Sequence, residues 1–353
     1  MSYKDGWAAL KLEMPNRVPR MEFSLNYHHA LISEITGTQV NADSPPELLK
    51  KVTYEAMRKW NYDLIWRTLI GRLYLNGIGT SMGHATFANN GSDFRNDKHS
   101  TFSGDLEEVY NFQPLEKLKN MSHSEMAEMF SKHYEESCAD YPDAVNMTGT
   151  YGTIISGLLF LFGWDLLLEA MGTDPVRFGE LTNRYAQWLQ PYFNAMADST
   201  AECIMVHDDI VWSAGPFANP AWYREYIFPN YKKYIAPLLD AKKVVLYTSD
   251  GNYSVFIDDI AKTGFMGFVM EPSTDMAYIA EKYGRTHSFI GNADTRVLMF
   301  GSKQDIYNEV KRCMDIGKKY PGFFMAVGNH ISPNTPVENA LYYNEVYEKL
   351  GKR

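Results

Sequence analysis

The sequence predicts an α/β protein, and specifically a single (β/α)8 TIM barrel. Short, continuously apolar runs of strand composition alternate with amphipathic stretches of helical length, a pattern typical of parallel strands joined by helical crossovers. Apolar runs without a polar alternation are expected when both faces of a sheet are covered. About eight such units fit into 353 residues, and no low-complexity linker divides them. We therefore expect one domain over residues 1–353.

The predicted elements follow one another from an N-terminal helical extension at residues 3–13. The first strand is expected at 17–24, and a helix at 46–60 leads to a strand at 63–66. Residues 70–115 are rich in Gly, Asn and Ser and lack periodicity, which indicates an elaborated loop region. Later strands are expected at 144–148, 203–206, 244–246, 267–270, 288–290 and 322–327. The helices between them are expected at 122–138, 153–171, 175–199, 220–239, 253–262, 275–283 and 303–318.

The composition limits the classes of function. Hydrophobic residues make up 45% and charged residues 22%, as in soluble globular proteins. The net charge of −9 disfavours nucleic acids and anionic membranes as partners, since both require a basic surface. Three widely spaced cysteines and an N-terminus without a signal-like apolar run predict a cytoplasmic protein. The apolar run at 154–168 contains Asp165 and is short for a membrane span, which favours a buried helix.

Polar residues are concentrated where the predicted strands end. In a barrel these positions meet at one rim, and the active site lies there. The residues are Glu22, Tyr27, His28, Tyr151, His207, Asp208, Asp209, Tyr247, Ser249, Asp250, Glu271, Asp294, Asn329 and His330. Such a set can bind a divalent metal, with zinc favoured once imidazole takes part, or can supply general acids and bases. A single Asp at a strand end can equally be a helix N-cap or the partner of an arginine, which is the structural alternative for Asp208 and Asp294.

Other kinds of site find no support in the sequence. There is no GxGxxG opening a helix after the first strand, no GxxxxGK[ST] phosphate loop and no GxSxG nucleophile motif. The cysteines do not fall at strand ends, which argues against a thiolate nucleophile or a sulfur-rich zinc site.

Three segments near strand ends resemble the uroporphyrinogen decarboxylase superfamily. They are Tyr-Thr-Ser-Asp-Gly-Asn at 247–252, Gly-Asn-Ala-Asp-Thr at 291–295 and Gly-Asn-His-Ile-Ser-Pro-Asn-Thr-Pro at 328–336. The resemblance extends over nearly the whole chain, is most specific after residue 200, and implies a single (β/α)8 barrel.

The chain departs from the two best-known patterns of that superfamily. The decarboxylases carry an Arg-Gln-Ala-Gly-Arg segment that holds porphyrin carboxylates. Here its place is taken by Arg20-Met21-Glu22-Phe23-Ser24, in which the acid would repel such a substrate. The thiol-activating methyltransferases hold zinc with His-x-Cys and a later Cys, where this chain has Tyr247-x-Ser249 and Asn329. Neither activity is expected.

A third group is more similar, through His-Asp-Asp at 207–209, Met-Glu-Pro at 270–272 and Gly-Asn-His-Ile at 328–331. These segments resemble the veratrol- or vanillate-type methyltransferases of anaerobic aryl ether O-demethylases. The resemblance implies that the protein moves a methyl group from a methoxylated aromatic compound to the cob(I)alamin of a partner corrinoid protein. It also implies Zn2+, for which the chain could supply Glu271, Asp250, Asp294 and His330. The resulting hypothesis assigns catalysis to His330, Asp250, Asp208 and Tyr151, and substrate contacts to Glu22, His28, His207, Tyr247 and Asn329.

Several alternatives remain open at this point. A protonated His or Asp could replace zinc in stabilising the phenoxide leaving group. The methyl donor could be a methylamine, a thioether or a small methoxy compound. The barrel could also be a non-catalytic docking module for a corrinoid protein. A homo-oligomer is possible.

Overall fold

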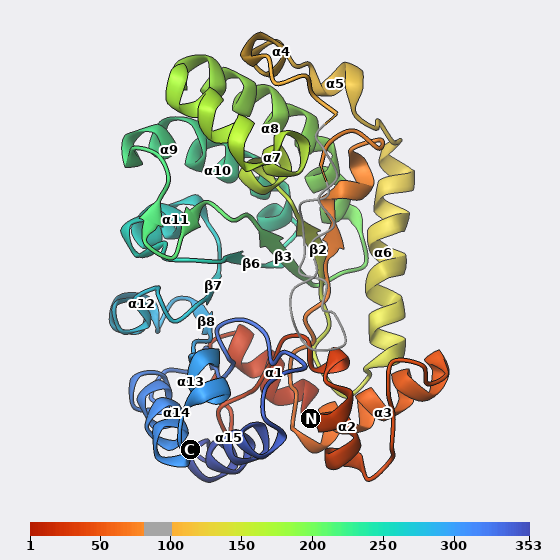
Figure 1. Cartoon of the computed structure of the whole chain (residues 1–353), viewed down its shortest axis with the longest axis vertical. Coiled ribbons are helices and arrows are strands. Elements are labelled where there is room, and N and C mark those ends of the chain that lie inside the picture. The colour runs from red at the N-terminus through yellow and green to blue at the C-terminus, as the bar shows by residue number, and fades with distance from the viewer. Residues whose placement is uncertain (81–100) are drawn as a thin grey trace.

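The computed structural model describes residues 1–80 and 101–353. Parallel strands form one sheet in the order β1-β2-β3-β6-β7-β8-β9, and helices surround it (Figure 1). The strands are β1 (Leu69–Ile70), β2 (Thr148–Tyr151), β3 (Cys203–His207), β6 (Val244–Ser249), β7 (Gly267–Met270), β8 (Ser288–Ile290) and β9 (Phe323–Phe324). A separate antiparallel hairpin consists of β4 (Val211–Trp212) and β5 (Gly215–Pro216).

Two N-terminal segments close the sheet into a barrel. Arg20 forms parallel bridges with Met325 on one side and with Tyr62 on the other. Leu64 in turn bridges Val145, just before β2. The circle of strands is therefore complete, and the predicted α/β barrel is confirmed. Residues 81–100 of the predicted loop region lie outside the described residues.

Two apolar cores follow from the alternation of side chains along the strands. Cys203 and Met205 of β3 face the barrel interior, whereas Ile204 and Val206 face the helices. Helix α1 (Tyr3–Leu10) covers the N-terminal end of the interior core with Trp7 and Leu10. It approaches so closely that a Cβ on Gly6 would lie 2.3 Å from a backbone oxygen of Asp63.

Most of the helices predicted from the sequence lie close to their expected ranges. Helix α6 begins after Ser122 because that residue and Glu125 form a capping box. The helices are α2 (His29–Thr36), α3 (Pro46–Lys59), α4 (Leu106–Tyr110), α5 (Pro114–Lys117), α6 (His123–Asp140), α7 (Ile154–Thr173), α8 (Pro175–Asp198), α9 (Pro220–Tyr226), α10 (Phe228–Asp240), α11 (Ile257–Thr263), α12 (Met276–Tyr283), α13 (Thr295–Phe300), α14 (Lys303–Gly317) and α15 (Val337–Leu350). Short 3-10 turns are η1 (Leu25–Tyr27), η2 (Gly71–Tyr74) and η3 (Ser254–Phe256).

Some predicted boundaries are wrong. The helix expected at 220–239 is divided into α9 and α10, because Pro229 cannot donate a backbone hydrogen bond and its ring disfavours continuation of the preceding helix. Strand β6 continues to Ser249, so Tyr247 lies within the strand and not after it. Strand β2 starts only at Thr148 and includes Tyr151. These shifts change which side chains can face the site.

Helix α7 is long and apolar enough, by length and composition, to cross a membrane. However, 72% of its most apolar window is buried inside the protein, as in the core helix of a globular fold. It is interrupted at Gly163, whose φ of 76° is not helical.

Candidate active site

Side chains from successive strands converge at the C-terminal end of the barrel. Because Cys203 and Met205 face the interior, the alternation along β3 turns His207 the same way. The same alternation, continued from the interior residues of the other strands, selects a set of residues that we call the rim. They are Phe23, Trp66, Tyr151, His207, Asp250, Glu271 and His330.

Asp209 connects three of these strand ends. Its Oδ1 lies 2.9 Å from His207 Nε2 and accepts the backbone N–H of Asp250 at 2.9 Å. Its Oδ2 accepts the hydroxyl of Tyr151 at 2.9 Å. The backbone N–H of Asp209 itself donates to the hydroxyl of Ser156, at 2.7 Å. The loop after β3 is thus held by polar contacts to β2, β6 and α7.

The charges in this cluster shift one another's protonation. Burial raises the pKa of Asp209, but the neighbouring His207 and the hydrogen bonds from Asp250 and Tyr151 together bring the pKa down to about 2. For His207, burial lowers the pKa, but the carboxylates of Asp209, Asp250 and Asp208 together raise it above its usual value. Desolvation, together with the carboxylates of Asp209 and Glu271, raises the pKa of Asp250 to about 8. Asp250 therefore holds a proton at neutral pH.

Aromatic rings line the rim next to this cluster. Phe23 and Trp66 pack on the interior core, are only partly buried, and contact each other edge to face with centroids 4.9 Å apart. Trp66 also contacts the ring of His207, at 6.2 Å, and Phe23 contacts that of His330, at 6.5 Å. The ring of Tyr151 lies 4.0 Å from His207. A flat apolar ligand would find an aromatic floor here.

His330 is held against the first strand segment. Its Nδ1 is hydrogen bonded to the hydroxyl of Ser24, and its backbone forms a parallel bridge with Phe23. Ser24 adopts a left-handed backbone conformation with φ of 60°, which is uncommon for a residue with a side chain. His330 therefore belongs to the aromatic side of the rim.

One group of residues has the geometry for a metal ion. Within residues 1–80 and 101–353, His207, Asp209 and Asp250 offer donor atoms that all lie within 4.8 Å of one another. One imidazole nitrogen and two carboxylates suit Zn2+, which accepts three protein ligands and an open position in catalytic sites. This donor set fits zinc, although it differs from the predicted one.

The family model described as uroporphyrinogen decarboxylase (URO-D) matches residues 44–350. The chain belongs to the uroporphyrinogen decarboxylase family. The match includes every strand of the barrel except the segment around Arg20.

Individual members of the uroporphyrinogen decarboxylase family are distant. The uroporphyrinogen decarboxylase of Geobacter sulfurreducens is 25% identical over 190 residues, which are 54% of each chain. That of Carboxydothermus hydrogenoformans is 28% identical over 183 residues, 51% of this chain and 50% of that protein. The chain thus spans about half the length of the curated relatives it matches. A methyltransferase from Methanosarcina mazei superposes with a TM-score of 0.65 over 99% of both chains, at 19% identity, which shows a shared fold.

Several of the predicted site residues come together in this family member. Tyr151, His207 and Asp250 meet around Asp209. Glu271 lies beside them and accepts a hydrogen bond from the side-chain amide of Asn329, at 2.6 Å. Because Asn329 directly precedes His330, the last strand also reaches this place.

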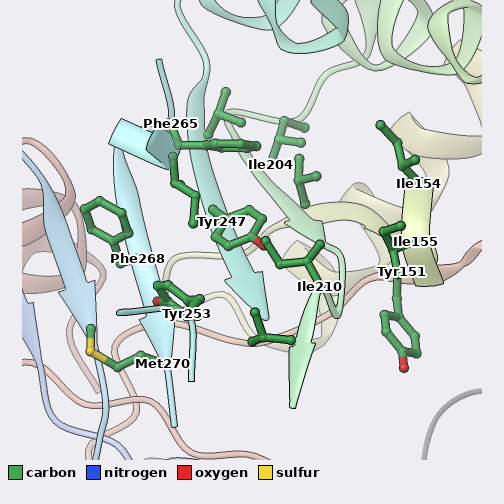
Figure 2. Packing of buried hydrophobic residues seen from close by; sticks show 14 of the residues in the cluster. Tyr151, Ile154, Ile155, Ile204, Ile210, Tyr247, Tyr253, Phe265, Phe268 and Met270 are labelled. Carbon is green, nitrogen blue, oxygen red and sulfur yellow. The ribbon is translucent and has the colours of Figure 1, made fainter. Parts of the chain in front are cut away.

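Two residues predicted to contact the substrate have side chains that face away from the rim. Tyr247 is fully buried between the sheet and α10, among apolar residues such as Ile204 and Phe265 (Figure 2). Glu22 points toward α15, where it pairs with Arg20 at 2.8 Å and accepts the hydroxyl of Tyr343 at 2.7 Å. Both occupy the outward-facing parity of their strands.

Three further predictions give way to structural roles. Asp208 is fully buried, and its carboxylate accepts the backbone N–H groups of residues 154, 155 and 156 at the start of α7. Asp294 caps α13 and is paired with Arg296. His28 caps α2, and its Nε2 is hydrogen bonded to the carbonyl of Thr335. Each of these three side chains accepts backbone N–H groups at the start of a helix.

The predicted zinc set is also not assembled as expected. Asp250 is the one member shared with the observed group, whereas Glu271, Asp294 and His330 are not part of it. Reasoning from the sequence places Asp209 among the strand-end residues but assigns it no individual role, and it does not identify Phe23 or Trp66 as site residues. The period-two alternation from the interior core would have identified the two aromatic residues, but it required the strand registers.

Proposed function

We propose that this protein demethylates a methoxylated aromatic compound and passes the methyl group to cob(I)alamin carried by a separate corrinoid protein. The observation that carries the proposal is the division of the rim. Phe23 and Trp66 form an aromatic surface, and His207, Asp209 and Asp250 form a charged cluster beside it. A methoxylated ring has the same two parts, an apolar face and an ether oxygen.

The aromatic surface would fix the ring of the donor. Ring contacts of this kind contribute about 0.5–1.5 kcal/mol each beyond the burial of area. Their larger effect is orientation, since the methyl carbon must lie in line between the ether oxygen and the attacking cobalt. Trp66 contacts His207, so a ring seated on Trp66 would bring its ether oxygen to the charged cluster.

The cluster would handle the charge that develops on the leaving oxygen. As the bond between the methyl carbon and the oxygen breaks, the methyl group goes to cobalt and the bonding electron pair remains on the oxygen. Asp250, with its pKa raised to about 8, is protonated at neutral pH and can donate to that oxygen. The Asp250 carboxylate is then reprotonated from solvent, to which it is exposed.

A zinc ion could stabilise the charge on the leaving oxygen in place of the Asp250 proton. His207, Asp209 and Asp250 would hold the ion, which would supply Lewis acidity to the ether oxygen. Holding an ion requires Asp250 to lose its proton, so the proton and the ion would be alternatives at this position.

The arginines argue against a porphyrin polyanion as substrate. Arg20 is fully buried, with its guanidinium against the rings of Trp60, Tyr343 and Tyr347. Arg17 is paired with Asp63 at 2.6 Å. Both arginines of the first strand segment therefore have partners within the protein and do not face the rim. The rim itself carries carboxylates, which would repel the acid side chains of a porphyrin.

The test is a reconstituted methyl transfer. The purified protein is mixed with a corrinoid protein in the Co(I) state and a panel of methoxybenzenes, and methylcobalamin is followed by its absorbance. Turnover with methoxylated aromatics, and none with methylamines or thioethers, is the expected result. Turnover with another donor alone would overturn the aromatic assignment, and tight binding of the carrier without turnover on any donor would favour a docking module.

A further inference from the structure

The geometry points to Glu271 as a positioning residue that connects the Asp250 turn to the His330 turn through two hydrogen bonds. We call this arrangement the Glu271 bridge. Glu271 Oε2 accepts the backbone N–H of Gly251 at 2.8 Å, and Oε1 accepts the side-chain amide of Asn329 at 2.6 Å. Gly251 directly follows Asp250, and Asn329 directly precedes His330. The inference rests on the proposed function for the chemistry that is positioned.

The backbone of the Asp250 turn is also fixed by contacts other than the Glu271 bridge. The backbone N–H of Asp250 donates to Asp209, and the next N–H, from Gly251, donates to Glu271. Gly251 has a φ of 83°, and a Cβ there would lie 2.7 Å from the backbone of Trp212. Two successive amides are thus fixed by two carboxylates, and the direction of the Asp250 side chain follows from them.

The Asn329 contact also has a defined polarity. A carboxylate only accepts hydrogen bonds, so Asn329 must present its NH2 group to Glu271. The last strand end packs closely at the same place, because a Cβ on Gly328 would lie 2.2 Å from Pro272 and 3.1 Å from Glu271. Asn329 therefore acts here as a hydrogen-bond donor to the bridge, and Glu271 serves the site through its neighbours.

Exchanging the two partners gives a direct test. In Asn329→Asp two carboxylates would face each other, and the repulsion would displace the Asp250 turn. A displacement of about 1 Å can cost on the order of 100-fold in rate, so we expect kcat to fall by about 10- to 100-fold with KM nearly unchanged. In the double variant Glu271→Gln with Asn329→Asp, the Gln NH2 donates to the new Asp while its oxygen still accepts Gly251. Most of the lost kcat should return.

Glu271→Gln alone should lower kcat less than Asn329→Asp does, because the Asn329 amide can turn over and present its oxygen to the new Gln. Glu281→Gln, at an exposed position on α12, is the matched control and should behave as the wild type. If the double variant is as slow as Asn329→Asp, the bridge does not act through this pair and the proposal is overturned. If Glu271→Gln abolishes zinc binding measured by titration calorimetry, Glu271 is a ligand and the proposal is equally overturned.

Failure of the proposed function can be distinguished from failure of the bridge. If the wild type transfers methyl groups from no donor, the proposed function falls. The urea unfolding midpoints of the wild type, Asn329→Asp, Glu271→Gln and the double variant then test the pair alone. A lowered midpoint for Asn329→Asp that the double variant restores supports the bridge, and additive midpoints exclude it.

Discussion

The two sides of the rim are built differently. Phe23 and Trp66, its aromatic side, lie on N-terminal segments that join the barrel through isolated parallel bridges. Asp209, Asp250 and Glu271, its carboxylate side, follow the regular strands β3, β6 and β7. The aromatic side offers an apolar surface that can orient a ring. The carboxylate side offers charged groups that are held in place by hydrogen bonds. If this division is real, substitutions on the carboxylate side should act mainly on kcat and those on the aromatic side mainly on KM.

The largest effect is expected for Asp250→Asn. The variant keeps the shape of the side chain but removes both the proton and the metal-binding oxygen, so we expect kcat to fall by about 10²- to 10⁴-fold. Methyl transfer to the corrinoid protein measures this, and circular dichroism checks that the fold is intact. Asp240→Asn is the control, since Asp240 is exposed where α10 ends, before β6 begins. Full activity in Asp250→Asn would show that Asp250 acts neither as the acid nor as a required metal ligand.

Asp208 directly precedes Asp209 in the sequence, but its side chain stabilises the fold and does not reach the rim. Its carboxylate accepts three backbone N–H groups of α7 and the hydroxyl of Tyr231, at 2.6 Å. Asp208→Ala leaves these buried donors without an acceptor and should destabilise the protein by about 2–4 kcal/mol. Urea unfolding measures the change. The folded fraction should keep kcat, and a stable variant with low kcat would instead return Asp208 to the active site.

The contrast between Asp208 and Asp209 shows which parts of the fold and the site the sequence predicts. Strand and helix alternation predicts the barrel because each strand is buried on both faces and reads as an apolar run. Polar residues after strands also predict the place of the site. Which of two neighbouring residues faces inward depends on the strand register, and a shift of one residue reverses every side chain. Tyr247 was misplaced for this reason, since β6 continues to Ser249.

The aromatic side was missed for a related reason. Phe23 and Trp66 are apolar residues in strand-like segments, and most such residues belong to a core. Their partial burial at the rim depends on where the barrel closes, which is set by the pairing of Arg20 with Met325 and Tyr62. Contacts between residues so far apart in sequence leave no local pattern.

Zinc affinity should depend on pH through the carboxylate side. The pKa of Asp250 is raised to about 8, so below that pH the ion must displace a proton, and above it the ligand is already ionised. Apparent affinity should therefore rise about tenfold per pH unit from pH 6 to 8 and level off by pH 9, with the raised pKa of His207 adding to the slope. Competition with a chromogenic chelator measures this. An affinity independent of pH would mean that zinc binds elsewhere, and active protein without zinc would leave Asp250 as the acid.

The smallest effect is expected on the aromatic side, for Trp66→Leu. Leu keeps the apolar contact with the interior core but removes the ring that faces Phe23 and His207. The loss of one ring contact, about 0.5–1.5 kcal/mol, should raise KM for a methoxylated aromatic donor about two- to tenfold while kcat changes less. Phe300→Leu is the control, because Phe300 is an aromatic residue that is 80% exposed at the end of α13. A fall in kcat larger than the rise in KM would show that Trp66 also orients the ether toward the charged cluster. The two sides of the rim would then act as one unit.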